Sequence, residues 1–155
     1  MKFIVGKGEN PNLGKYRKED LELARTFAKK VYDEFGNFLK AVVLFGSSAR
    51  ATSKIKKGSD IDILLIVDDI TTTLTPEVVE TYRIIVEKAI ADVSKRLHIT
   101  SMKLTTFWEY ARVGDPVAVN ILRDGVALMD SGFFDPMRVL LMRGRIRPTA
   151  ESIWT

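Results

Sequence analysis

The sequence predicts an α+β fold in which helices pack on a mixed β-sheet. Two apolar runs, residues 41–45 and 60–67, have the length and β-branched content of buried strands. Only a short polar segment separates them, which leaves no room for the crossover helix that a parallel pair needs. The alternation of helices and strands elsewhere would also suit a doubly wound sheet. The short connection favours the mixed sheet.

The first half of the chain contains one long helix and these two strands. Residues 8–15 are rich in turn formers and predict a loop. Residues 18–37 place apolar side chains on one helical stripe, and they predict the first helix. The stripe consists of Leu21, Ala24, Phe27, Ala28, Val31 and Phe35. Residues 52–59 form a polar loop that carries Lys54, Lys56 and Lys57, and residues 68–75 are a threonine-rich connection.

The second half begins with a helix whose start is well marked. Thr75 is a good N-cap, Pro76 suits the first helical position, and the apolar stripe runs from Val78 to Leu97. A third strand is predicted within residues 99–105. Thr106 and Glu109 have capping-box spacing for a short helix. The remaining elements are a helix from Asp115 to Leu122 capped by Gly125, a strand over residues 126–129 and a helix over residues 134–143.

Composition limits the class of protein. The 155 residues suit a single domain over residues 1–155, with an N-terminal extension to about residue 17 and a basic tail over residues 144–155. No apolar run is long enough to span a membrane, and the N-terminus becomes polar too early for a signal peptide. Cysteine is absent, which excludes disulfides and fits a cytoplasmic protein. The net charge of +4 suggests an anionic ligand or partner.

A phosphate-binding turn is predicted directly after the first strand. Gly46 lets the backbone turn sharply and lets a ligand approach without a Cβ in the way. Ser47 and Ser48 can cap a short helical turn whose free N–H groups favour an anion. Arg50 adds a guanidinium, which has the fork geometry that phosphate prefers. Ser59, directly before the second strand, completes the predicted nucleotide-binding set.

A metal site is predicted at the start of the second strand. Asp60 and Asp62 are two residues apart, so on a strand they face the same side. Two carboxylates side by side repel each other unless a cation lies between them. Mg²⁺ prefers oxygen ligands and substrate phosphates. Asp60 and Asp62 are therefore the predicted catalytic residues and the predicted ligands of one or two Mg²⁺ ions.

This combination resembles the signature of the DNA polymerase β-type nucleotidyltransferase superfamily, and the short chain resembles its minimal, MNT-type members. The resemblance is carried mainly by residues 41–67, with Gly46-Ser47 and then Asp60-x-Asp62. It implies a palm-like mixed sheet, binding of an NTP such as ATP with Mg²⁺, and transfer of a nucleoside monophosphate such as AMP to a hydroxyl. Minimal members often act with a helical HEPN-type partner, and some are antitoxins that adenylylate it.

One feature departs from the family pattern. The family adds a third carboxylate on a later strand, where it helps to hold the second metal and activates the attacking hydroxyl. No Asp or Glu lies between Val93 and Trp108 in this chain. His98, the only histidine, lies where the third predicted strand begins and could act as a weak base or be structural. Binding of NTP is therefore a firmer expectation than turnover.

Three functions stay open at this stage. The first is a nucleotidyltransferase enzyme, and the second is a degenerate domain that binds NTP or a partner protein without turnover. The third is an RNA-associated protein that uses the lysine loop and the arginines between Arg138 and Arg147. Trp154, near the end of the basic tail, could anchor an interface with a partner or a second copy of the chain.

Overall fold

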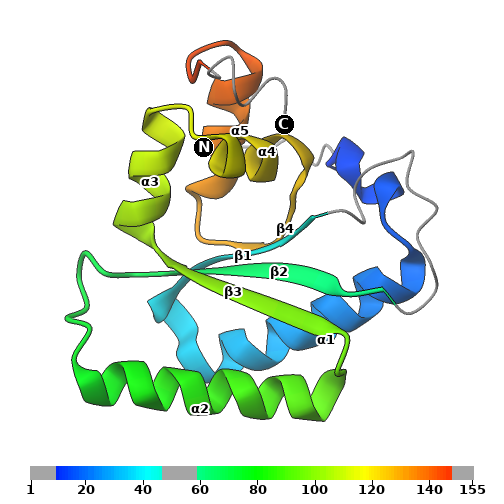
Figure 1. The fold of residues 1–155 in the computed structure, drawn as a ribbon, viewed down its shortest axis with the longest axis vertical. Coiled ribbons are helices and arrows are strands. Elements are labelled where there is room, and N and C mark those ends of the chain that lie inside the picture. Colours follow the sequence, from blue (N-terminus) through cyan, green and yellow to red (C-terminus); the bar gives the residue numbers. More distant parts are fainter. Residues whose placement is uncertain (1–9, 47–58, 148–155) are drawn as a thin grey trace, which may run out of the picture.

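The computed structural model describes residues 10–46 and 59–147 and has three layers, with a β-sheet between two layers of helices (Figure 1). The strands are β1 (Leu39–Phe45), β2 (Ile61–Val67), β3 (Leu97–Lys103) and β4 (Val126–Asp130). The α-helices are α1 (Lys18–Phe35), α2 (Pro76–Val93), α3 (Leu104–Arg112), α4 (Pro116–Asp124) and α5 (Phe134–Met142). Two short 3₁₀ helices are η1 (Pro11–Lys15) and η2 (Gly36–Phe38).

The sheet is mixed, as the short connection between the first two strands predicts. Its strand order is β3-β2-β1-β4. β1 is antiparallel to both β2 and β4, whereas β2 and β3 are parallel and are joined through α2. The doubly wound alternative is therefore wrong, because the first two strands pair directly with opposite directions.

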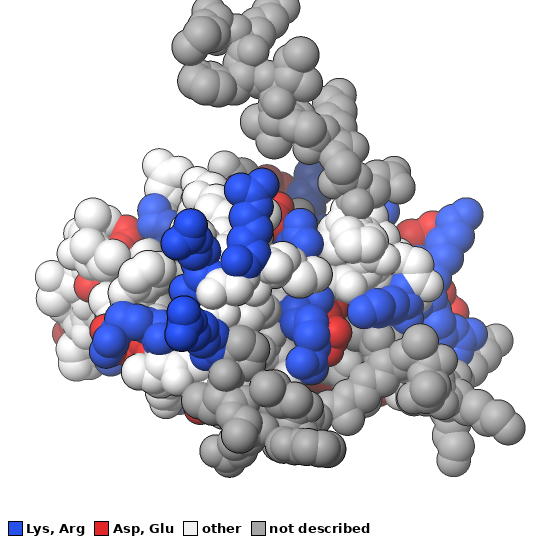
Figure 2. All heavy atoms as spheres, turned by 90° about the horizontal axis from the view of Figure 1, so that it is seen from above, with Lys and Arg blue, Asp and Glu red and all other residues white. Residues whose placement is uncertain are grey.

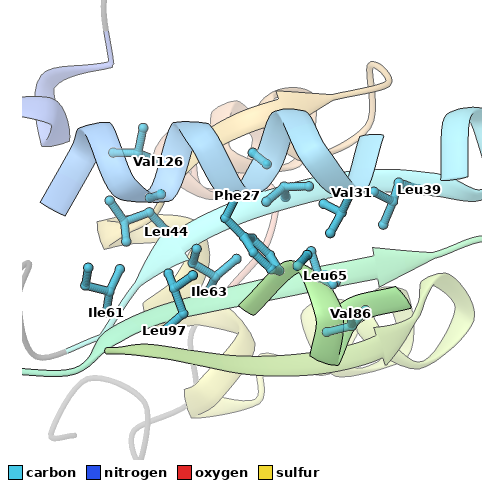
Figure 3. Close-up of a cluster of buried hydrophobic side chains, with 14 of the residues drawn as sticks. Phe27, Val31, Leu39, Leu44, Ile61, Ile63, Leu65, Val86, Leu97 and Val126 are labelled. Carbon is cyan, nitrogen blue, oxygen red and sulfur yellow. The ribbon is translucent and has the colours of Figure 1, made fainter. Parts of the chain in front are cut away.

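One face of the sheet is covered by α1 and α2. Phe27 of α1 is completely buried and points into the sheet between side chains of β2 (Figure 3). The same cluster contains alternate residues of β2, namely Ile61, Ile63 and Leu65. Burying a large side chain of this kind contributes about 1.5–3 kcal/mol, so this cluster holds α1 on the sheet.

The opposite face is covered by α3, α4 and α5. The other alternate residues of β2, Leu64 and Ile66, pack here against Phe107 of α3 and Phe134 of α5. Both faces of β2 are thus buried, which explains why its sequence is almost continuously apolar. Within the described residues, no helix is long and apolar enough to cross a membrane.

The segment before α1 is more ordered than the predicted loop over residues 8–15. Residues 11–15 form η1, and Asn12 is buried with its side-chain amide donating to the carbonyl of Arg123 at 2.8 Å. The Tyr16 hydroxyl lies within hydrogen-bond distance of the carbonyls of Leu44 and Asp124. The local sequence does not predict these long-range contacts. Turn-forming residues occur both in loops without such contacts and in segments whose side chains donate hydrogen bonds to distant carbonyls.

Several helix ends agree with the sequence. The Thr75 side chain accepts a hydrogen bond from the Val78 N–H, and Pro76 begins α2. The Asp115 side chain caps α4, and Gly125 ends that helix with its N–H bonded to the carbonyl of Ile121. Local capping chemistry therefore located these ends without tertiary information.

Other boundaries needed correction. α1 ends at Phe35 rather than at residue 37, because residues 36–38 form η2. Strand β2 begins at Ile61, one residue after Asp60, and β4 extends to Asp130, one residue beyond the predicted strand. α4 continues to Asp124, two residues further than predicted, and α5 ends at Met142, one residue earlier.

The largest corrections concern β3 and α3. Leu97 begins β3 rather than ending α2, and β3 ends at Lys103. α3 begins at Leu104, so the capping box predicted at Thr106 is wrong. The Asp69 carboxylate instead accepts hydrogen bonds from the Thr105 N–H and hydroxyl. A side chain from the β2–α2 connection thus caps α3, which a local pattern cannot reveal.

Candidate active site

The candidate site lies at the edge of the sheet where β1 ends and β2 and β3 begin (Figure 1). Phe45, the last residue of β1, pairs with Asp62 of β2. Gly46 therefore follows the strand end directly beside Asp62. Since Ile61 and Ile63 belong to the α1–α2 face, Asp62 faces the side of α3, α4 and α5.

Gly46 and Asp62 are in such close contact that no side chain fits at position 46. The φ angle of Gly46 is +100°, a conformation that residues with a Cβ rarely adopt. A Cβ built at this position would lie 2.4 Å from Asp62 Oδ2. Position 46 thus requires glycine for two independent reasons: the positive φ angle of its backbone and the close approach of the Asp62 carboxylate.

His98 is a second residue in contact with Asp62. The two residues pair in register on the parallel strands β2 and β3. His98 Nδ1 lies 3.1 Å from Asp62 Oδ1. The His98 side chain is 66% exposed, and the Asp62 side chain is 24% exposed. The edge of the sheet therefore presents a half-buried carboxylate beside an accessible imidazole.

The environment of Asp62 penalises its negative charge. Burial is the main cause that raises the pKa of this carboxyl above its usual range, and the charge of Asp60 raises it further. The hydrogen bond from His98 and its charge act in the opposite direction. Among the described residues, no Lys or Arg forms an ion pair with Asp62. A divalent cation at this carboxylate would supply the missing positive charge.

Asp60 is exposed and lies just before β2, on a segment that Arg96 holds in place. The Arg96 guanidinium donates to the carbonyl of Ser59 at 3.0 and 2.9 Å and forms a 2.8 Å ion pair with Asp20 of α1. The Arg96 carbonyl accepts a hydrogen bond from the Ile61 N–H at 2.8 Å. Arg96 thus positions the backbone on both sides of Asp60.

Comparison with known proteins identifies the family. The Nucleotidyltransferase domain family matches residues 24–122, which include Gly46, Asp60, Asp62 and His98. The chain belongs to the nucleotidyltransferase domain family. No match was found among curated proteins.

Solved structures agree with the nucleotidyltransferase fold. A candidate nucleotidyltransferase from Sulfolobus solfataricus is 20% identical, with a TM-score of 0.50 over 83% of this chain and 96% of that chain. A Shewanella oneidensis complex of a tri-AMPylated HEPN toxin with an MNT antitoxin contains a chain that is 15% identical. Its TM-score is 0.45 over 81% of this chain and 85% of that chain, too low to bear on function.

The structure brings together only part of the nucleotidyltransferase site that the sequence predicts. Gly46 and Asp62 are in contact, and Ser59 lies on the segment anchored by Arg96. Ser47, Ser48 and Arg50 lie outside the described residues, as do Lys54, Lys56, Lys57 and Trp154. Within residues 10–46 and 59–147, no group of three or more His, Cys, Asp or Glu side chains is gathered closely enough to hold a metal.

The structure adds two residues to the candidate site, His98 and Arg96. The sequence indicates His98 only as a weak base or a structural residue, because its contact with Asp62 depends on the parallel register of β2 and β3. In the sequence Arg96 is only a charged residue at a helix–strand junction, and nothing near it indicates that it holds another segment in place. In the structure Asp20, on the first turn of α1, is buried at 1% exposure and therefore needs a cation beside it, but the sequence does not reveal this burial.

The surface around the site is unevenly charged. On the face seen in Figure 2, which looks down on the α3–α5 side of the sheet, Lys and Arg side chains cover more of the surface than Asp and Glu side chains. One hollow of about 340 Å³ lies between α1 and α2, and its lining includes Lys30, Lys88 and Asp92. By strand alternation Asp62 is on the α3–α5 side of the sheet, whereas this hollow is on the α1–α2 side.

Proposed function

We propose that this chain binds a nucleoside triphosphate, most simply ATP, with Mg²⁺ and transfers its nucleoside monophosphate to a hydroxyl. The observation that carries the proposal is the contact between Gly46 and Asp62. A turn that excludes every side chain lies directly against a carboxylate that lacks a cationic partner among the described Lys and Arg residues. A phosphate-binding turn and a metal ligand must be neighbours if one cation is to bridge protein and triphosphate.

Each part of the chain has a distinct role in this proposal. Asp60 and Asp62 hold the cation, which when bound neutralises phosphate charge at the reacting centre. Gly46 leaves room for the triphosphate, and Ser47, Ser48, Arg50 and Ser59 bind its oxygens. The fixed backbone of residues 59–61 keeps the carboxylates oriented, since positioning supplies much of the catalysis in phosphoryl transfer.

A second candidate function is a degenerate domain that binds NTP or a partner protein without turnover. The observation that favours it is the absence of a carboxylate on β3, whose residue opposite Asp62 is His98. Loss of the group that activates the acceptor would leave nucleotide binding intact and remove transfer.

The proposal is tested by ATP binding and transfer measured side by side. Calorimetry with ATP and Mg²⁺ is expected to show metal-dependent binding by the wild type and none by an Asp60→Ala/Asp62→Ala double variant. Asp92→Asn is the control, because Asp92 is an exposed acid on α2, which covers the opposite face. Failure of the wild type to bind any of the four NTPs would overturn the proposal. Binding without transfer of α-phosphate label to any acceptor would favour the degenerate domain.

We further propose that the acceptor is a hydroxyl of a HEPN-type protein and that the chain acts as its antitoxin. This proposal rests on the resemblance to minimal nucleotidyltransferases, and the basic face in Figure 2 suits an acidic partner. Incubation with α-labelled ATP and a purified HEPN-type protein from the same genome is expected to label that protein. Label that remains in ATP, or that appears on RNA instead, would contradict this choice of acceptor.

A further inference from the structure

His98 occupies the position that faces Asp62 across β2 and β3. Because parallel neighbours in register project to the same side, their side chains lie on the same face of the sheet. Leu97 and Ile99 belong to the α1–α2 cluster or pack against it, which fixes His98 on the opposite face. β3 carries no Asp or Glu, so His98 is the side chain of this strand that can provide a metal ligand beside Asp62.

The spacing of the two side chains suits a shared cation. Asp62 Oδ1 and His98 Nδ1 are 3.1 Å apart. Two adjacent ligands of an octahedral ion with bonds near 2.1 Å are separated by about 3.0 Å. A histidine that served only to fill the core would be buried, whereas the His98 side chain is 66% exposed and its hydrogen-bond partner is Asp62.

We propose that His98 and Asp62 are two ligands of one divalent cation, completed by water or phosphate oxygens, and that the imidazole nitrogen makes the site select Mn²⁺ over Mg²⁺. The inference rests on the proposed function, since it concerns the same cation. Mg²⁺ is a hard ion that favours oxygen ligands, whereas imidazole suits transition-metal ions. Exchanging a carboxylate for an imidazole also removes one negative charge, which weakens the binding of a hard cation most.

The direct test is pulsed electron paramagnetic resonance of bound Mn²⁺ in the absence of nucleotide. Spin-echo modulation detects a nitrogen nucleus coordinated to Mn²⁺, and the chain has one histidine, so the signal has one side-chain source. Wild-type protein is expected to show this nitrogen modulation, and selective ¹⁵N labelling of histidine is expected to change its frequency. His98→Gln is expected to abolish it.

Calorimetry on metal alone provides a second readout. His98→Gln is expected to weaken Mn²⁺ binding by about tenfold or more, because loss of even a residue that only supports a metal ligand costs about this much affinity. The loss of Mg²⁺ affinity is expected to be smaller. His98→Asp is expected to shift the preference toward Mg²⁺. Thr100→Ala is the control, because Thr100 is the next exposed residue on the same face of β3 and should leave both readouts unchanged. Thermal unfolding of each variant confirms that it is folded.

The outcomes separate this inference from the proposed function. Mn²⁺ that binds in an Asp62-dependent way without nitrogen modulation would overturn the role of His98 and leave the proposed function standing. Nitrogen modulation that persists in His98→Gln would also overturn it. Absence of Mn²⁺ and Mg²⁺ binding, with and without ATP, would overturn both.

Discussion

Replacement of Gly46 by alanine should damage the candidate site far more than it damages the fold. A Cβ at this position would lie 2.4 Å from Asp62 Oδ2, about 1 Å closer than the 3.4 Å at which ordinary contact begins. The carboxylate must therefore move away by about this distance. A misplacement of about 1 Å at a reacting centre can reduce activity roughly 100-fold, and we expect a comparable loss in transfer.

The effect on stability should be smaller and has a separate cause. The φ angle of +100° at Gly46 is unfavourable for alanine, and such backbone strain costs about 1–3 kcal/mol. For a domain of this size each kcal/mol lowers the melting temperature by roughly 2–4 °C. Gly46→Ala should thus remain folded at 25 °C while its metal and nucleotide binding are measured.

Gly132→Ala provides a matched control. Gly132 has a φ of +106°, but a Cβ there would meet no atom within 4 Å. It shares the backbone cost of Gly46→Ala without the contact to Asp62. We expect both variants to lose similar stability in urea unfolding and only Gly46→Ala to lose Mg²⁺-dependent ATP binding. Equal binding by both variants and the wild type would refute the assignment of the turn and the carboxylate to one site.

Three further changes test other contacts. Asp62→Asn should raise the melting temperature of the metal-free protein at pH 7, because the raised pKa means that the charged form is penalised in the fold. The gain should shrink as the pH falls through the raised pKa of Asp62, and it should vanish below the ordinary pKa of an aspartate, about 4. A gain that is constant with pH would contradict this cause. Arg96→Met should cost about 3–5 kcal/mol in urea unfolding, since it leaves Asp20 buried without its cation, and an Asp20→Leu/Arg96→Met variant should recover part of this loss. Asp115→Ala should cost about 1 kcal/mol by removing the α4 cap, and a loss below 0.3 kcal/mol in the same assay would contradict that role.

The order and type of the elements could be predicted from the sequence because the signals are local and strong. The stripe of α1, the cap at Thr75 and the apolar run of β2 each depend on residues close together in the chain. The short connection between β1 and β2 also predicted an antiparallel pair and hence a mixed sheet, and the structure confirms this. Boundaries failed where distant groups take part, as with Asp69, which caps α3 from another connection.

The candidate site was only partly predictable for the same reason. Gly46 and Asp62 were identified by residue type and spacing, and the pairing of Phe45 with Asp62 brings them together. The contact between Asp62 and His98 required the register of a parallel pair separated by α2, which no short motif encodes. Arg96 could not be recognised, because its partners, Asp20 and the backbone of residues 59–61, lie far from it in the sequence.

The antiparallel pairing of β1 and β2 has a consequence for how such a domain can evolve. The ladder from Ala41–Ile66 to Phe45–Asp62, rather than the length of the chain between the strands, sets how far Gly46 lies from Asp62. The number of residues that connect the two strands can therefore change without altering that distance, since lengthening a connection adds little closure entropy. Selection can act on the connection between the strands while the ladder preserves the contact between Gly46 and Asp62.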